Sequence, residues 1–509
     1  MSTATERGRS AWAARLVALI VVVTSAACGP AHQPDTTLRM ALASAPRNLD
    51  PRLATDATSE RINRLLYRRL VEFDGESLPT PSLASWEQLD RTHYRFTLGE
   101  QGRSFSDGTR LTAEDVAATY ASILDPATNS PHRALLEIIT AISAEDPDVV
   151  EFHLREPDPL FPAYLGIGIL PAPMIRSGHR FQTQPVGSGT FDLHTWQEPG
   201  RLRLTRRRDA QPLEFITVKD PNVRVMKLLR GEVQMLQNDL SPELVAYLAA
   251  APEVRVTRGP GANFSYLGFN LEAPDTGKPE VREALALALD RATILNHLFR
   301  GGGRTAEGLF PPDHWAANPD LMAYPHNPQR ARTLLSAAGY SPDHPLHLTC
   351  KTSSDPFRVR LATVIQAQWR AVGVELKVQS YDWGTFFGDI QAGRFQVYGL
   401  TWVGVRTPDI FRYVFGSAAI PPDGANRGRY RSTAADQLIA TARTEPDLAR
   451  QAVLYRDLAA LLHRDLPYIP LWYEDQIFAA RTGLTGYRLA PDGNYDGLDW
   501  VDWHPGSAP

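Results

Sequence analysis

Residues 362–380 read ATVIQAQWRAVGVELKVQS, and this stretch predicts a helix followed directly by a strand. The helix is expected to end at Gly373, because glycine readily adopts the left-handed conformation that ends helices. Val374, Leu376 and Val378 then alternate with polar residues, which is the pattern of a strand with one buried side. The stretch therefore predicts one helix-then-strand unit.

The same order of elements recurs along the chain. Asn327 and Pro328 are typical of a helix start, and Gly339 is typical of its end. Thr112 is expected to cap another helix. A further helix is expected over residues 447–465, with an apolar face made of Leu448, Ala452, Tyr455, Leu458 and Leu462. Because helices alternate with strands, the predicted fold class is α/β.

The first residues predict export. Three arginines precede the apolar run LVALIVVV at 16–23, and small residues lead to Cys28. A basic start, a short apolar run and small residues are typical of a secretory signal, and the run is too short to span a membrane. We therefore expect a signal peptide over 1–27, a lipid anchor on Cys28, as in a bacterial lipobox, and a tether over 28–36. The alternative is an ordinary signal peptide with an accidental cysteine.

Composition indicates a soluble protein of two or three domains. The chain has 509 residues, of which 43% are hydrophobic and 22% are charged. Its net charge of −4 argues against nucleic acid as a partner. The chain has two cysteines, so a lipidated Cys28 would leave Cys350 without a disulfide partner, and Cys350 is expected to be a buried thiol.

Familiar catalytic motifs do not occur in the sequence. We find no phosphate-binding loop, dinucleotide fingerprint, GxSxG elbow, HExxH or CxxC. His344 and His347 would lie on opposite sides of a strand, which does not favour a metal site. We therefore expect no enzyme activity, no cofactor and no bound metal.

Nine strings, in order along the chain, resemble the large solute-binding proteins of bacterial ABC importers, the peptide- and nickel-type receptors called family 5. The strings are NLDP (48–51), LYRRLVEFD (66–74), PSLASW (81–86), HYRFTLGEQGRSFSDGTRLTAEDV (93–116), PVGSGTF (185–191), LGFNL with VREALALALDR (267–271 and 281–291), NPQRARTLLSAAGY (327–340), VIQAQWRAVGVELKVQSYDW (364–383) and LPYIPLWY (466–473).

The resemblance implies a periplasmic-binding-protein fold of type II, with two lobes around a hinged cleft and an extra third domain. By this resemblance the segments 37–72, 184–262 and 476–509 form lobe I. The extra domain covers 73–183, and lobe II covers 263–475.

The resemblance also implies a function. The protein is expected to be an exported, lipid-anchored monomer at the periplasmic or cell-surface side of a membrane. There it would capture a peptide or peptide-like small molecule and deliver it to an inner-membrane ABC permease with its ATPase. Nickel chelates, haem and other small organic ligands stay open. The alternatives are an envelope signalling or assembly lipoprotein that binds ligand without transport, and an exported hydrolase.

The resemblance places ligand recognition just after Trp402. Peptide-binding members carry an aspartate three residues later, which pairs with the α-amine of the peptide, but this chain has Val405 there. Arg406 follows, and an arginine suits a carboxylate or phosphate. One hypothesis is therefore an acidic ligand end held by Arg406. The alternatives are that Arg406 pairs with Asp409 or another acid of the scaffold, or that Asp409 replaces the missing aspartate.

Three more aromatic residues are expected at the cleft by resemblance, and each could instead belong to the core. Phe264 and Tyr266 precede the LGFN string, and Trp383 follows the predicted strand VELKVQS. The Gly- and Pro-rich loop 416–430 carries Arg427 and Arg429. It is interpreted either as a solvated loop or as a lid or permease-docking surface.

Overall fold

The computed structural model describes residues 36–197 and 200–504. The predicted signal peptide, Cys28 and nearly all of the predicted tether lie outside the described residues. The chain divides into two units, Met1–Thr37 and Leu38–Pro509, and the following concerns the second unit alone. In the part of the chain that the structure describes, no helix combines the length and apolar character that crossing a membrane requires.

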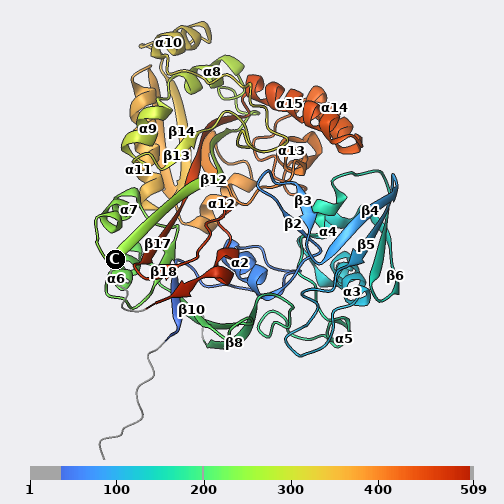
Figure 1. Cartoon of the computed structure of the whole chain (residues 1–509). Helices are drawn as coiled ribbons and strands as arrows, with labels where there is room; N and C mark the ends of the chain where they lie inside the picture. The colour runs from blue at the N-terminus through green and yellow to red at the C-terminus, as the bar shows by residue number, and fades with distance from the viewer. Residues whose placement is uncertain (1–35, 198–199, 505–509) are drawn as a thin grey trace, which may run out of the picture. The chain divides into compact units, whose positions relative to one another are not determined.

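The largest element of the fold is a mixed sheet of eleven strands (Figure 1). Neighbouring strands along it are β15 (Val374–Tyr381), β14 (Leu346–Ser353), β16 (Val397–Trp402), β12 (Val254–Phe269), β17 (Tyr468–Arg481), β11 (Met235–Gln237), β1 (Leu38–Leu42), β10 (Pro212–Thr217), β9 (Arg201–Arg206) and β8 (Phe191–Gln197), while β13 (Gly303–Thr305) pairs with β17 to the side. The pairs β14–β15, β14–β16, β1–β10 and β1–β11 are parallel.

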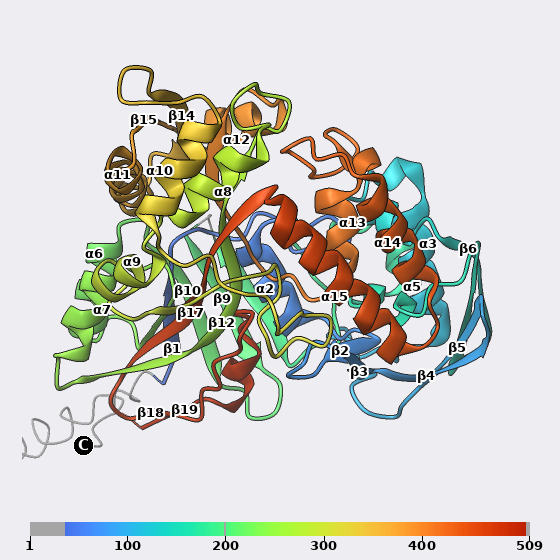
Figure 2. The same cartoon turned by 90° about the horizontal axis from the view of Figure 1, so that it is seen from above.

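The antiparallel pair β12–β17 joins the two halves of this sheet, and Figures 1 and 2 show the two strands side by side. Near one end of the pair, β17 also pairs with β11, and near the other end β12 also pairs with β16. The register between the two strands breaks between Gly259 and Asn263. A second register shift lies between Ser265 and Tyr266, so the ladder is interrupted at two points.

A separate antiparallel sheet has the order β4–β5–β7–β6 and its own apolar core. Its strands are β4 (Ala84–Asp90), β5 (His93–Leu98), β6 (Ile139–Asp146) and β7 (Val149–Leu154), and it packs on α3 (Ala113–Leu124). Thr112 and Asp115 form a reciprocal capping box at the start of α3, which confirms the predicted cap. Two small sheets pair β2 (Val71–Phe73) with β3 (Pro79–Pro81), and β18 (Leu484–Thr485) with β19 (Asp502–Trp503).

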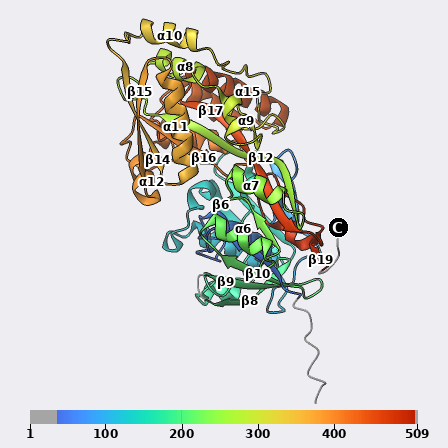
Figure 3. The ribbon, with the colours of Figure 1, turned by 90° about the vertical axis from the view of Figure 1, so that its left-hand side faces the viewer.

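Helices cover the sheets, and Figure 3 shows α11 (Pro356–Arg370) and α12 (Trp383–Gln391) beside β14. The remaining α-helices are α2 (Ala57–Leu66), α4 (Arg133–Leu136), α5 (Ala172–Arg176), α6 (Pro221–Leu229), α7 (Pro242–Ala249), α8 (Pro279–Leu287), α9 (Arg291–His297), α10 (Pro328–Ala337), α13 (Asp409–Phe415), α14 (Thr433–Thr444) and α15 (Leu448–Asp465). The mixed α/β architecture confirms the predicted fold class.

Residues 362–380 fold as a helix followed by a strand, as predicted. Helix α11 is followed by Gly373, which has a φ of 92°, and β15 begins at the next residue. Trp369 on α11 is fully buried in the core beneath β14 and β15, and its indole Nε1 donates a hydrogen bond to the carbonyl of Leu285 at 3.1 Å. The buried Cys350 lies in the same core, and burial raises the pKa of its thiol to about 12.

We expect Trp369→Ala to lower the free energy of unfolding by about 3–5 kcal/mol, because it leaves a cavity in a packed core. The measurement is the urea unfolding transition followed by circular dichroism. Val453→Ala on the exposed side of α15 is the control and should change the free energy by less than about 0.5 kcal/mol. Equal transitions for the two variants would contradict the packing role of Trp369.

Candidate functional site

Three of the residues predicted for the ligand site meet at the junction of β12, β16 and β17. Phe264 on β12 is the direct strand partner of Trp402 on β16. The ring of Tyr266 stacks on Tyr468 with centroids 3.9 Å apart, and lies nearly parallel to Trp402 at 6.5 Å and to Phe264 at 5.7 Å. The strand pairing therefore creates one aromatic cluster, in which Phe264 and Tyr266 are buried.

Arg427 is inserted into this aromatic cluster. The carbon at the centre of its guanidinium lies 4.8 Å from the ring centre of Trp402 and 5.1 Å from that of Phe387. Its Nη1 donates a long hydrogen bond to the hydroxyl of Tyr266 at 3.5 Å. Arg427 is only 8% exposed, so the interpretation of its loop as solvated is wrong at this residue. Cation–π contacts with two rings stabilise the guanidinium there.

Trp383 is joined to the aromatic cluster through Phe387 and Arg427. Trp383 and Phe387 lie on α12, which begins at the cap residue Asp382, and their rings stack at 5.4 Å. Trp383 is 59% exposed, which is unusual for so large an apolar side chain. The aromatic cluster therefore extends from the buried Tyr266 to the solvent at Trp383.

Arg406 lies outside the aromatic cluster and has an acidic partner of its own. Its guanidinium forms an ion pair with Asp492 and lies 5.0 Å from the ring centre of Phe73. Burial, together with the nearby cations of Arg64 and Arg69, lowers the pKa of Arg406 to about 9. Of the sequence alternatives, the structure has Arg406 paired with a scaffold acid, and that acid is Asp492 rather than Asp409.

Asp409 is also engaged within the scaffold. It is the first residue of α13, and its two carboxylate oxygens accept hydrogen bonds from Arg412, each at 2.9 Å. Arg443 of α14 lies 3.9 Å from the same carboxylate. Two arginines therefore neutralise Asp409, and the structure does not bring it to the aromatic cluster in place of the missing aspartate.

A cavity of about 220 Å³ lies beside the segment that follows Arg406. Thr407 lines it together with Glu60, Arg64 and Arg69. Glu60 lines the cavity and is still accessible to solvent, but partial desolvation by the surrounding protein raises the pKa of its carboxyl to about 7. The cavity thus holds an acid that changes its charge near neutral pH, next to two arginines.

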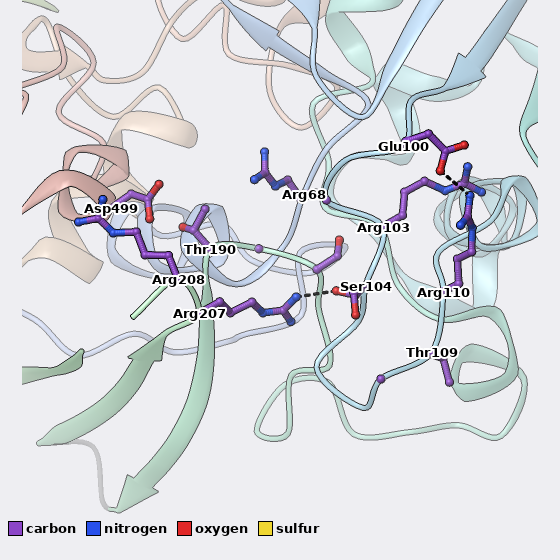
Figure 4. Close-up of a pocket in the computed structure, with 14 residues that line it drawn as sticks. Arg68, Glu100, Arg103, Ser104, Thr109, Arg110, Thr190, Arg207, Arg208 and Asp499 are labelled. Atoms are coloured by element: carbon purple, nitrogen blue, oxygen red, sulfur yellow. Dashed lines mark hydrogen bonds and ion pairs between the residues drawn. The ribbon is translucent and has the colours of Figure 1, made fainter. Parts of the chain in front are cut away.

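A larger cavity of about 650 Å³ contains none of the predicted ligand residues (Figure 4). Its wall combines residues of the strings at 93–116 and 185–191. Arg110 pairs with Glu100 at 3.0 Å, and Arg207 pairs with Asp192 at 2.6 Å and donates to the carbonyl of Ser104. Arg103 also pairs with Asp148 at 2.6 Å and Arg208 with Asp209 at 3.6 Å, so acids neutralise most of the positive charge of the wall. We interpret the cavity as a junction of the scaffold.

One group of possible metal ligands occurs within residues 36–197 and 200–504. His93, Glu151 and His153 lie on adjacent strands of the four-stranded sheet. His93 Nε2 lies 3.0 Å from the Glu151 carboxylate, which Arg95 also engages at 2.8 Å. The group lies on a different sheet from the aromatic cluster.

Comparisons with known proteins agree with the fold and identify the family. The model of the bacterial extracellular solute-binding proteins, family 5, matches residues 50–420. Di/tripeptide-binding protein 2 of Pseudomonas aeruginosa is 28% identical over 514 residues, covering 93% of this chain and 96% of the relative. The peptide transport periplasmic protein SapA of Salmonella typhimurium is 30% identical, covering 84% and 85%.

A solved structure extends the likeness to three dimensions. NikZ from Campylobacter jejuni, determined in complex with Ni(L-His), superposes with a TM-score of 0.80 at 23% identity, covering 92% of this chain and 100% of that one. At this level of identity the comparison shows the fold, and it agrees with the type II architecture that the sequence predicts.

The pKa of Glu60 gives a pH-dependent prediction. A carboxyl that binds its proton more tightly in the folded state stabilises the fold at low pH, and this stabilisation is lost as the pH rises from about 4.5 to about 7. We therefore expect the free energy of unfolding of the wild type to fall relative to that of Glu60→Gln across this range. Parallel pH profiles in denaturant titrations would contradict the raised pKa.

Proposed function

Because the chain belongs to the bacterial extracellular solute-binding proteins of family 5, we propose that it captures a peptide or peptide-like small molecule between two lobes and delivers it to an ABC permease in the membrane. The names of the two curated relatives, a di/tripeptide-binding protein and a peptide transport protein, support this substrate class. We further propose that the protein acts by binding and not by catalysis.

The observation that carries the proposal is the irregular centre of the β12–β17 pair. The expected lobe boundaries at 262/263 and 475/476 fall on the stretch where the register breaks between Gly259 and Asn263. Gly261 packs so closely that a Cβ there would lie 2.0 Å from the carbonyl oxygen of Glu474. We propose that this stretch is the hinge, since the interruption of the ladder from Gly259 to Asn263 lets the two strands bend there.

Ion pairs cross the proposed boundaries between the parts of the molecule. Arg406 of lobe II pairs with Asp492 of lobe I, and Arg360 pairs with Glu243 at 3.0 Å. Arg443 of lobe II lies 3.5 Å from Glu156 of the extra domain. We propose that these contacts favour the closed form, so that Arg406 acts as a latch between lobes.

We also propose export through a signal peptide over 1–27, a lipid anchor at Cys28, and action as a monomer. The name of the Salmonella relative, a periplasmic protein, supports an extracytoplasmic location. The basic and apolar residues before Cys28 support the signal and the anchor.

The proposed role of the Arg406–Asp492 ion pair in holding the lobes closed can be tested with a variant. Asp492→Asn should increase the radius of gyration measured by small-angle X-ray scattering and reduce the retention of co-purified ligand about tenfold. The reason is that a charge-assisted hydrogen bond contributes about 1.5–3 kcal/mol to the closed form. Glu100→Gln is the matched control, because its partner Arg110 lies in the same proposed domain and both are exposed. A wild-type radius and wild-type retention in Asp492→Asn would contradict the latch.

Transport itself can be tested in the natural host. We expect residues 29–509, purified from a bacterial periplasm, to carry a small-molecule mass in native mass spectrometry that is released on denaturation. Deleting the gene should abolish uptake of that molecule. Binding without any loss of uptake would favour the signalling or assembly alternative, and absence of binding by any solute would refute the receptor.

A further inference from the structure

We propose that Arg427 is the anion-binding group of the ligand site, so that the solute is recognised by a carboxylate. This inference rests on the proposed receptor function and names the substrate class of the same site. It transfers to Arg427 the role that the sequence suggested for Arg406.

The first argument is the missing counter-ion of Arg427. An arginine is charged at any relevant pH, and a buried charge is ordinarily paired with an acid. Within the described residues, 36–197 and 200–504, Arg427 forms no ion pair. Its polar side-chain contact there is the long hydrogen bond to the Tyr266 hydroxyl. Arg406 and Asp409, in contrast, both have partners of opposite charge. Arg427 is therefore available to bind an anion.

The second argument is a neighbouring donor that also has no acceptor. The indole Nε1 of Trp402 is buried and has no hydrogen-bond partner among the described residues. The guanidinium of Arg427 lies over the ring of this same tryptophan. A buried donor without an acceptor is costly, and a carboxylate paired with the Arg427 guanidinium can also accept from the Trp402 indole.

The third argument is that the position of Arg427 is fixed beforehand. The side chain of Asn426 donates to the carbonyls of Gly416 and Tyr430 at 2.9 and 2.7 Å, and accepts from the amide of Tyr430 at 2.9 Å. A Cβ at Gly428 would lie 2.6 Å from the carbonyl oxygen of Phe269, so the loop packs directly on β12. A donor that is held in place loses little entropy when an anion binds, which favours a binding role over that of a mobile lid.

The surroundings also indicate which end of a solute binds here. The cation of Arg427 would repel an ammonium group. The rings of Phe387 and Trp383 lead from Arg427 to the solvent and suit an apolar or aromatic portion of the solute. The site therefore suits a small acid with an apolar body and does not require a free amine.

The test compares dipeptide pools in three forms, unmodified, N-acetylated and C-terminally amidated, by isothermal titration calorimetry on residues 29–509. We expect the N-acetylated pool to bind as tightly as the unmodified pool. The amidated pool should bind at least about tenfold more weakly, because it lacks the charge that pairs with Arg427. Equal binding of the amidated pool would overturn the proposal without any variant.

Arg427→Gln should abolish the preference for the carboxylate over the amide. Arg429→Gln is the matched control: it makes the same change two residues away, at an arginine that pairs with Glu272 at 3.2 Å, and it should keep the preference. As a probe that needs no peptide, acetate at constant ionic strength should raise the melting temperature of the wild type but not of Arg427→Gln.

If neither acetate nor any carboxylate pool acts on the wild type, the proposal is wrong. The receptor function still stands in that case if native mass spectrometry finds a neutral or cationic solute. The failure of the Arg427 assignment and the failure of the proposed function are thus distinguishable.

Discussion

The antiparallel pairing of β12 with β17 is the constraint on which the rest of the structure depends. These two strands hold both halves of the large sheet, and their ends position the aromatic residues of the candidate site. Phe264 and Tyr266 face Trp402 because β12 and β16 are paired in that register. A shift of the strand register by one residue would turn each of these side chains to the opposite face of the sheet and separate the rings of the aromatic cluster.

The scaffold could be predicted from the sequence because its signals are local. The helix before Gly373, the strand after it and the cap at Thr112 each depend on a few adjacent residues, and each occurs in the structure. The predicted helix over 447–465 also forms, but Leu448 is exposed instead of buried. It lies in the first turn, where periodicity alone does not reveal whether a neighbouring element is present to cover it.

The partners of the charged residues could not be predicted in the same way. Arg406 pairs with Asp492, a residue far along the chain, and spacing in sequence carries no signal for such a contact. Arg427 was visible only as an arginine in a loop rich in glycine and proline, and such loops are ordinarily solvated. Its burial follows from tertiary packing on Trp402 and Phe387. Phe387 and Tyr468 were missed as site residues for the same reason.

The fixed loop around Asn426 has an evolutionary consequence. The Asn426 side chain holds the backbone beside Arg427 by hydrogen bonds to Gly416 and Tyr430, and neither bond involves the side chain of residue 427. Under the proposed role of Arg427, selection for a different residue at 427 would change the charge that the site prefers and would leave these bonds of the framework in place. Receptors for chemically different nutrients could then diverge from one ancestral scaffold through single substitutions at this position.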